Sequence, residues 1–188
     1  DSPWVSPNVF GDGTLVRDTQ QLSAESLRKL DLWIKALKDE GIYIWLDMHV
    51  QRAFTANDNI DDFGELPEKE GRVDLKGYAY VNDSIQKAMK RFAEQYLTHV
   101  NEYTGLAYKD DPAIAAVLIT NENDLTQHYG NALMPNKDVP RHSERYMAAA
   151  KAFARQHDLP ADLTWRAWEH GPSKLFLNDL EQRFNADM

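Results

Sequence analysis

Apolar residues recur along the chain with two different periods, and each period predicts a different kind of element. Over residues 24–40 they recur every three or four positions, which indicates an amphipathic helix with one apolar face. The residues of this face are Leu27, Leu30, Ile34 and Leu37. Ser23 precedes the pattern and is a suitable N-cap, because its hydroxyl can accept a hydrogen bond from a free amide of the first turn.

Two nearly uninterrupted apolar runs predict strands that are buried on both faces, as in parallel sheets. They cover residues 42–48 and 113–120, and a second amphipathic helix is predicted between them, over residues 83–103. The expected core face of that helix consists of Ile85, Met89, Phe92, Tyr96 and Val100. The order helix, strand, helix, strand predicts an α/β fold with helices packed on a parallel sheet.

The segments between these elements are long and polar. Residues 50–81 and 121–140 are rich in Gly, Pro, Asn and Asp, and loops of this length often cover active sites. Helices are predicted again over residues 141–157 and 172–187. Between them, residues 163–165 suit either a short strand or part of a structured insertion.

Two strands cannot form a parallel-sheet domain alone, and a complete (β/α)₈ barrel needs about 250 residues. With 188 residues and both ends lacking a natural boundary, the chain is expected to be a fragment of one TIM-barrel catalytic domain, from about the end of strand 2 to helix 4. An open doubly wound sheet is the alternative, but no Gly-rich phosphate loop follows either strand. A truncated barrel exposes strand edges, so we expect self-association or marginal stability.

The amino-acid composition limits the binding partners and the chemistry that can be expected. The formal net charge of −9 disfavours a nucleic-acid surface and an anionic membrane surface. The sequence contains no cysteine, which excludes disulfides and thiol catalysis. No stretch approaches the roughly 18 apolar residues that cross a bilayer. No leader is visible; a secreted or periplasmic location is compatible with the sequence, which assigns no compartment.

Barrel enzymes carry their chemistry where strands end. The first predicted strand leads to His49 and then Arg52, and the second leads to Asn121 and Glu122. A carboxyl at the edge of an apolar strand is expected to be partly desolvated, which favours the protonated form that a general acid needs. In the alternative interpretation, Glu122 only begins a polar loop and pairs with a nearby Lys or Arg.

The second strand also carries a resemblance to a known family. The run AAVLITNEN over residues 115–123 resembles the fourth-strand motif of clan A glycoside hydrolases, especially family 5, the cellulase family. The run LDMH over residues 46–49 resembles the preceding strand of that family. The resemblance implies a (β/α)₈ barrel, a carbohydrate substrate and no cofactor. It also implies that Glu122 is the general acid/base, that Asn121 contacts the sugar 2-hydroxyl and that His49 lies at the substrate site.

Two features depart from the family pattern. Asn123 stands where the family usually has Pro. The family's nucleophilic Glu lies on the seventh strand and is expected beyond residue 188, and retaining hydrolysis needs both carboxyls about 5–5.5 Å apart. Residues 1–188 alone are therefore expected to be inactive.

Other residues near the predicted strand ends suit a substrate site less specifically. Arg52 and His128 can reach a sugar, although a solvated loop position is the favoured explanation of each. Trp4 can stack on a sugar, which packing explains at least as well. A metal-dependent barrel hydrolase using Asp47 and His49 is a second interpretation, for which no third ligand is evident. A non-catalytic carbohydrate-binding barrel is a third interpretation.

Overall fold

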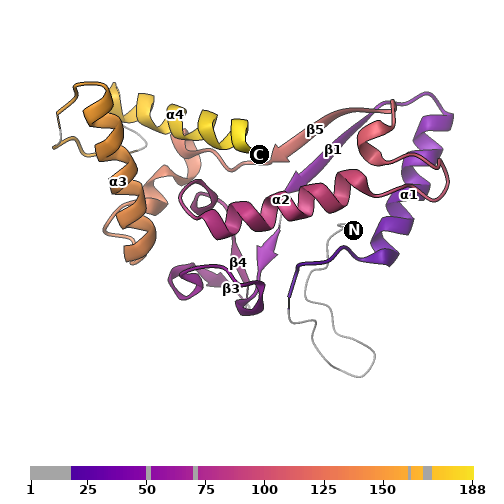
Figure 1. Cartoon of the computed structure of the whole chain (residues 1–188), viewed down its shortest axis with the longest axis horizontal. Coiled ribbons are helices and arrows are strands. Elements are labelled where there is room, and N and C mark those ends of the chain that lie inside the picture. Colours follow the sequence, from indigo (N-terminus) through magenta and orange to yellow (C-terminus); the bar gives the residue numbers. More distant parts are fainter. Residues whose placement is uncertain (1–17, 50–51, 70–71, 161, 167–170) are drawn as a thin grey trace. The chain divides into compact units, whose positions relative to one another are not determined.

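The structure is a computed structural model that describes residues 18–49, 52–69, 72–160, 162–166 and 171–188. Its helices and strands are α1 (Ala24–Asp39), β1 (Ile44–His49), β2 (Ala53–Phe54), β3 (Glu68–Lys69), β4 (Arg72–Asp74), α2 (Asp83–Thr98), β5 (Ile114–Thr120), α3 (Pro140–Gln156) and α4 (Pro172–Asp187) (Figure 1). The described residues form two compact units, which we describe separately. Unit 1 contains residues 18–58 and 87–121, and unit 2 contains residues 59–86 and 122–188.

Unit 1 is built on a parallel pair of strands. β1 and β5 run side by side, with Ile44 opposite Ile114 and His49 opposite Thr120 (Figure 1). The predicted order of helices and strands and the parallel sheet are therefore confirmed. The sheet has two strands among the described residues and does not close into a barrel there.

The prediction that both strands are buried on both faces is wrong. Along β1 the side chains alternate: Leu46 and Met48 are buried, whereas Trp45 is 66% exposed. Helices α1 and α2 cover one face of the strand pair, and the core there contains Leu27, Ile34, Leu46, Met48, Phe92, Ala93, Tyr96 and Tyr108. Among the described residues no second layer covers the other face, which is why the apolar run does not translate into burial.

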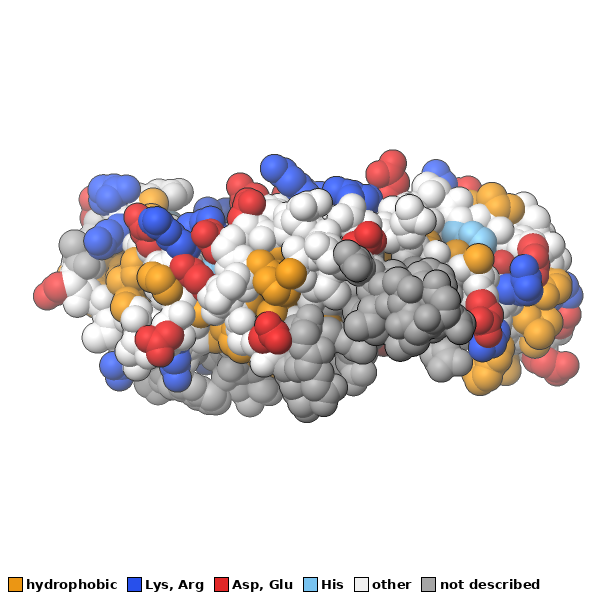
Figure 2. Space-filling model, turned by 90° about the horizontal axis from the view of Figure 1, so that it is seen from below, with side chains coloured by type: hydrophobic (Ala, Val, Ile, Leu, Met, Phe, Trp, Pro, Cys, Tyr) orange, Lys and Arg blue, Asp and Glu red, His pale blue; other side chains and the backbone are white. Residues whose placement is uncertain are grey.

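Apolar side chains are also exposed on α1. Leu32 and Trp33 point away from the helix's buried face, and both are more than half exposed. Figure 2 shows hydrophobic side chains on the surface in the part of the view that α1 occupies, at the right. The N-cap prediction for this helix is confirmed, since the Ser23 hydroxyl accepts a hydrogen bond from the Ser26 amide.

A buried carboxylate, Asp31, organises the segment after α2. Its oxygens accept hydrogen bonds from the Tyr108 hydroxyl at 2.6 Å and from the Glu102 amide, and they lie 2.9–3.0 Å from His99 Nε2. The Asn101 side chain donates to the Asp31 carbonyl. These bonds compete with helical ones, and α2 ends at Thr98 rather than near residue 103.

The early end of α2 also corrects one predicted core position. Val100 lies after the helix and is 55% exposed, instead of extending its apolar face. The other four predicted positions, Ile85, Met89, Phe92 and Tyr96, are buried as expected.

Unit 2 has an aromatic core between α3 and α4. Tyr146 and Phe153 of α3 pack against Phe176 of α4, and Trp165 completes the cluster. The Tyr146 hydroxyl donates to the Trp165 carbonyl at 2.6 Å. Residues 162–166 form no strand, so the alternative of a short strand at 163–165 is wrong. β3 and β4 form a short antiparallel hairpin.

We predict that Asp31→Ala lowers the free energy of unfolding by about 2–4 kcal/mol, because the buried Tyr108 hydroxyl and His99 lose their acceptor. Urea denaturation followed by circular dichroism measures the change. The control is Asp39→Ala at the end of the same helix, where the Lys35–Asp39 pair is exposed and contributes less than about 1 kcal/mol. Equal effects in the two variants would contradict the role given to Asp31.

Candidate functional site

The carboxyl ends of β1 and β5 lie next to each other in unit 1. Because the strands are parallel and His49 pairs with Thr120, His49 lies one residue before the level of Asn121. Asn121 is half-buried and is joined directly to Glu122, the first residue of the second segment of unit 2. The backbones at the two strand ends that the sequence selected therefore lie side by side.

His49 points into the core rather than toward solvent. Its side chain is buried, with the ring 5.0 Å from that of Phe92. Neither ring nitrogen has a hydrogen-bond partner of good geometry among the described residues. Burial, reinforced by the positive charge of Arg52 and opposed weakly by the Met89 carbonyl, lowers the pKa of His49 to about 3. The imidazole is therefore neutral at physiological pH.

Arg52 is also buried inside unit 1, so the favoured prediction of a solvated loop residue is wrong. Its guanidinium donates to the carbonyl oxygens of Ala88 and Thr19 at 3.1 and 3.2 Å. It also lies over the rings of Phe54 and Phe92. Burial lowers the pKa of Arg52 to about 10, so the group stays charged. Through these bonds Arg52 connects three segments of unit 1 that are far apart in the sequence.

Glu122 has an environment different from the predicted one. Its side chain is 70% exposed, so the expected desolvation is absent, and its carboxylate lies 3.8 Å from Lys76 Nζ. The pairing with a base that the alternative interpretation anticipated is thus present. The Glu122 backbone is left-handed, with φ of 49°, a conformation that non-glycine residues rarely adopt and that often marks functional sites.

Asn123 holds the turn that follows Glu122. Its buried Oδ1 accepts a hydrogen bond of 2.6 Å from the Gly77 amide. Gly77 has φ of 77°, and a Cβ at this position would lie 2.7 Å from Tyr129 Cβ. Only glycine fits there. Lys76 is thus positioned by the residue that follows it.

The segment after Asn123 is a π-helix, Leu125–Tyr129, a form that is rare and frequent at functional sites. Glu181 of α4 caps it, because its Oε1 accepts hydrogen bonds from the amides of Leu125 and Thr126. His128 lies in this π-helix, but its side chain is outside the described part of the chain. Trp4 likewise lies outside the described residues.

The geometry gives no support to a metal site at Asp47 and His49. Asp47 is exposed on β1, whereas His49 is buried. In the described ranges, no group of three or more His, Asp or Glu side chains is arranged to hold a metal ion.

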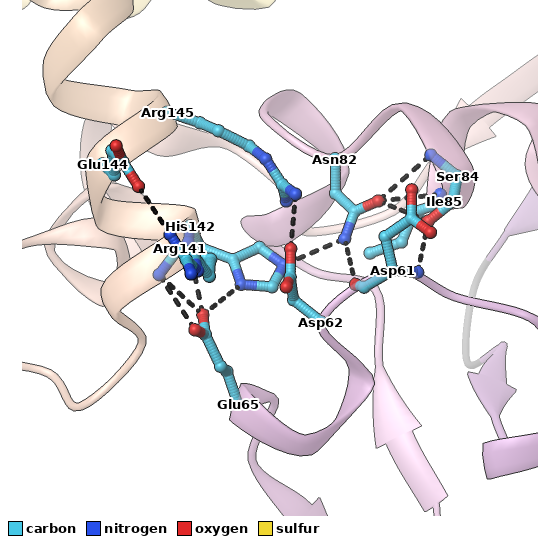
Figure 3. Close-up of polar contacts among 10 residues, drawn as sticks. All are labelled: Asp61, Asp62, Glu65, Asn82, Ser84, Ile85, Arg141, His142, Glu144 and Arg145. Carbon is cyan, nitrogen blue, oxygen red and sulfur yellow. Dashed lines mark hydrogen bonds and ion pairs between the residues drawn. The ribbon is translucent and has the colours of Figure 1, made fainter.

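A second polar cluster in unit 2 joins the starts of two helices (Figure 3). Asn82 Oδ1 accepts hydrogen bonds from the amides of Ser84 and Ile85 and so caps α2. Its Nδ2 must then donate to His142 Nε2, at 2.9 Å. His142 Nε2 is therefore the acceptor, and the proton lies on Nδ1, which donates to Glu65 at 2.9 Å.

Glu65 caps α3 from a distant loop. Its carboxylate accepts hydrogen bonds from the amides of Arg141 and His142 in the first turn, where the helix dipole favours negative charge. Burial alone would raise the pKa of Glu65, but the hydrogen bonds from the His142 side chain and these two amides outweigh it and lower the pKa. The carboxylate is thus held ionised beside a fully buried imidazole.

Comparison of the chain with protein-family models, with curated proteins and with solved structures finds no match. The described part of the chain has no helix whose length and apolar character suit a membrane span. The function must therefore be argued from the site itself.

Several residues of these sites escape sequence reasoning. Lys76, Gly77 and Glu181 lie 46 to 56 positions from their partners around Glu122, and Glu65 lies 77 positions from His142. No periodic pattern marks such contacts. Asn82 alone had a local signal, because an Asn directly before the predicted helix start is a typical N-cap.

We predict that burial of neutral His49 makes unfolding pH-dependent. The unfolded state takes up a proton near pH 6.5, while the folded pKa is about 3. Stability is therefore complete above pH 6.5 and falls as the pH drops toward 3, by about 2 kcal/mol at pH 5. His49→Phe should remove this slope in urea denaturation at pH 5, 6 and 7.5, whereas the exposed control His157→Gln should keep it. An unchanged slope in His49→Phe would contradict the burial of this ring.

We also predict that Glu65→Gln lowers the unfolding free energy by about 1–2 kcal/mol at pH 7, through loss of the charged cap of α3. Because the folded pKa of Glu65 is below its ordinary value of 4.5, its contribution is complete above that pH and is lost as the pH falls through the folded pKa. The difference between wild type and variant should thus shrink in acid. Glu144→Gln, at an exposed position of α3, is the control with an effect below about 0.5 kcal/mol.

Proposed function

We propose that the chain is the acid/base portion of a retaining β-glycoside hydrolase with a (β/α)₈-barrel fold, and that it acts on a poly- or oligosaccharide. The observation that carries this proposal is the parallel pairing of β1 and β5, with His49 opposite Thr120. It supports the proposal because Asn121 and Glu122 follow the carboxyl end of a parallel strand, where barrel enzymes carry their catalytic residues.

In this mechanism Glu122 acts twice. It first protonates the glycosidic oxygen while a nucleophilic carboxylate, from a strand outside residues 1–188, attacks the anomeric carbon. It then takes a proton from the water that releases the sugar. Asn121 donates an amide hydrogen bond to the 2-hydroxyl without adding charge. The exposure of the Glu122 side chain gives a substrate oxygen access to the carboxyl group.

Lys76 places a condition on this scheme. Its ammonium group lies 3.8 Å from the Glu122 carboxylate, so a glycosidic oxygen must displace the lysine to reach that carboxyl group. Since Glu122 is mostly exposed, this ion pair is screened by solvent and is easily displaced.

We predict that Glu122→Gln, in a chain that also carries the nucleophile, lowers turnover of glycosides with poor leaving groups by about 10²–10⁴-fold. Substrates with activated leaving groups should be affected less in the first step, because they need no protonation. Azide should restore part of their turnover by replacing the water that Glu122 activates. Initial rates with both substrate classes measure these effects.

The matched control is Glu94→Gln, an exposed glutamate of α2, which should leave turnover unchanged. Unchanged turnover in Glu122→Gln would contradict the assignment. Saturable oligosaccharide binding without any turnover would instead favour the non-catalytic carbohydrate-binding barrel. Loss of turnover on chelation would favour the metal-dependent hydrolase.

A further inference from the structure

The side chain of His142, in the first turn of α3, connects two helix starts of unit 2 through its two ring nitrogens (Figure 3). Its Nδ1 lies 2.9 Å from the Glu65 carboxylate, and its Nε2 lies 2.9 Å from Asn82 Nδ2. The ring is fully buried, so water cannot replace either partner unless the surrounding residues move. The two groups that it contacts therefore determine which ring nitrogen carries a proton.

The side-chain amide of Asn82 has an orientation that is fixed independently of His142. Its Oδ1 accepts hydrogen bonds from the Ser84 amide at 3.1 Å, from the Ser84 hydroxyl at 2.6 Å and from the Ile85 amide at 3.3 Å. Its Nδ2 also donates to the Asp61 carbonyl at 2.9 Å. Rotating the amide by half a turn would place donor against donor and acceptor against acceptor at these contacts. Asn82 can therefore only donate to the ring.

A second proton on His142 disrupts this arrangement on one side only. The proton goes to Nε2, because Nδ1 already carries one, and the new Nε2–H group then faces the Asn82 Nδ2–H group. Two donors cannot bond to each other, so Asn82 must turn away, and its Oδ1 then leaves the Ser84 and Ile85 amides. On the other side, the bond to the Glu65 carboxylate becomes charge-assisted and strengthens.

The charged groups around the ring keep this change local. Burial opposes ionisation of Glu65, but hydrogen bonds from the His142 side chain and from two amides of α3 outweigh it and lower the pKa of Glu65. Tyr78 packs edge-on against the ring at 5.3 Å, and burial raises its pKa, so its hydroxyl stays neutral. The other charged side chains of the surrounding elements are two ion pairs and two aspartates: Arg145–Asp62, Arg141–Glu144, Asp61 and Asp83. An imidazolium beside Glu65 is thus a paired charge.

We propose that His142 is a pH-sensitive switch at the start of α2: when Nε2 takes up a proton, Asn82 releases the ring and α2 loses its cap, while Nδ1 keeps its bond to Glu65. At neutral pH the ring joins the starts of α2 and α3. In acid the link to Glu65 and α3 remains, and the link to α2 is broken. The switch depends on contacts within unit 2 and does not rest on the proposed hydrolase activity.

Imidazole and amide nitrogen-15 chemical shifts of the 188-residue chain, recorded from pH 7.5 to pH 5, test the switch. At pH 7.5 we expect His142 to carry a proton on Nδ1 and none on Nε2. As Nε2 takes up its proton, the amide signals of Ser84 and Ile85 should move with the same midpoint, and the hydrogen-exchange protection of Ile85 should fall about tenfold. The Ser26 amide is the internal control and should not move, because the Ser23 hydroxyl, which does not titrate, caps it.

Two variants separate the switch from a general effect of acid. His142→Gln offers Asn82 a neutral amide oxygen and Glu65 an N–H group, so the Ser84 and Ile85 signals should stay unchanged down to pH 5. Asn82→Asp keeps an N-cap oxygen, preserves the side-chain size and replaces the donor toward the ring by an acceptor. In this variant His142 should carry both protons at pH 7.5, with the cap of α2 intact at every pH.

Several results would overturn the proposal. One is a wild-type His142 whose Nε2 is already protonated at pH 7.5 or is still unprotonated at pH 5. Another is a pair of Ser84 and Ile85 signals that stay in place while Nε2 takes up its proton, or that move equally in Asn82→Asp. Movement of the Ser26 amide with the same midpoint would also overturn it, because acid would then unfold the chain as a whole.

Discussion

The register between β1 and β5 is the constraint on which the first unit and the candidate site depend. Two parallel strands end at the same edge, so His49 and the residues that follow Thr120 belong to one end of the sheet. The pair is held from one face by α1 and α2, whose apolar side chains meet Leu46 and Met48. On the other face Trp45 is exposed, and no further layer covers that face among the described residues.

The fold was predictable where its elements follow a local period. The helix periodicity and Ser23 predicted α1 closely, and the two apolar runs predicted β1 and β5. Burial was less predictable, because an apolar strand is buried only where another layer covers it. The end of α2 was also missed, since it depends on Asp31, a polar residue on the apolar face of α1 that bonds to side chains about 70 positions away.

The candidate site was predicted in position but not in environment. Strand order was enough to select Asn121, Glu122 and His49, because chemistry in barrels collects at strand ends. The exposure of Glu122 and its contact with Lys76 depend on a turn held by Asn123 and Gly77, a pair 46 positions apart. The burial of His49 turns a residue expected at the substrate site into a neutral core group beside Phe92.

The strand register is the most direct test of the proposed site. Amide and α-proton nuclear Overhauser contacts between β1 and β5 can be measured in the 188-residue chain. The parallel pattern is expected, with Leu46 opposite Val117, Asp47 opposite Leu118 and His49 opposite Thr120. Antiparallel contacts, or a parallel pair shifted so that His49 no longer lies opposite Thr120, would contradict the shared strand end on which the proposed role of Glu122 depends.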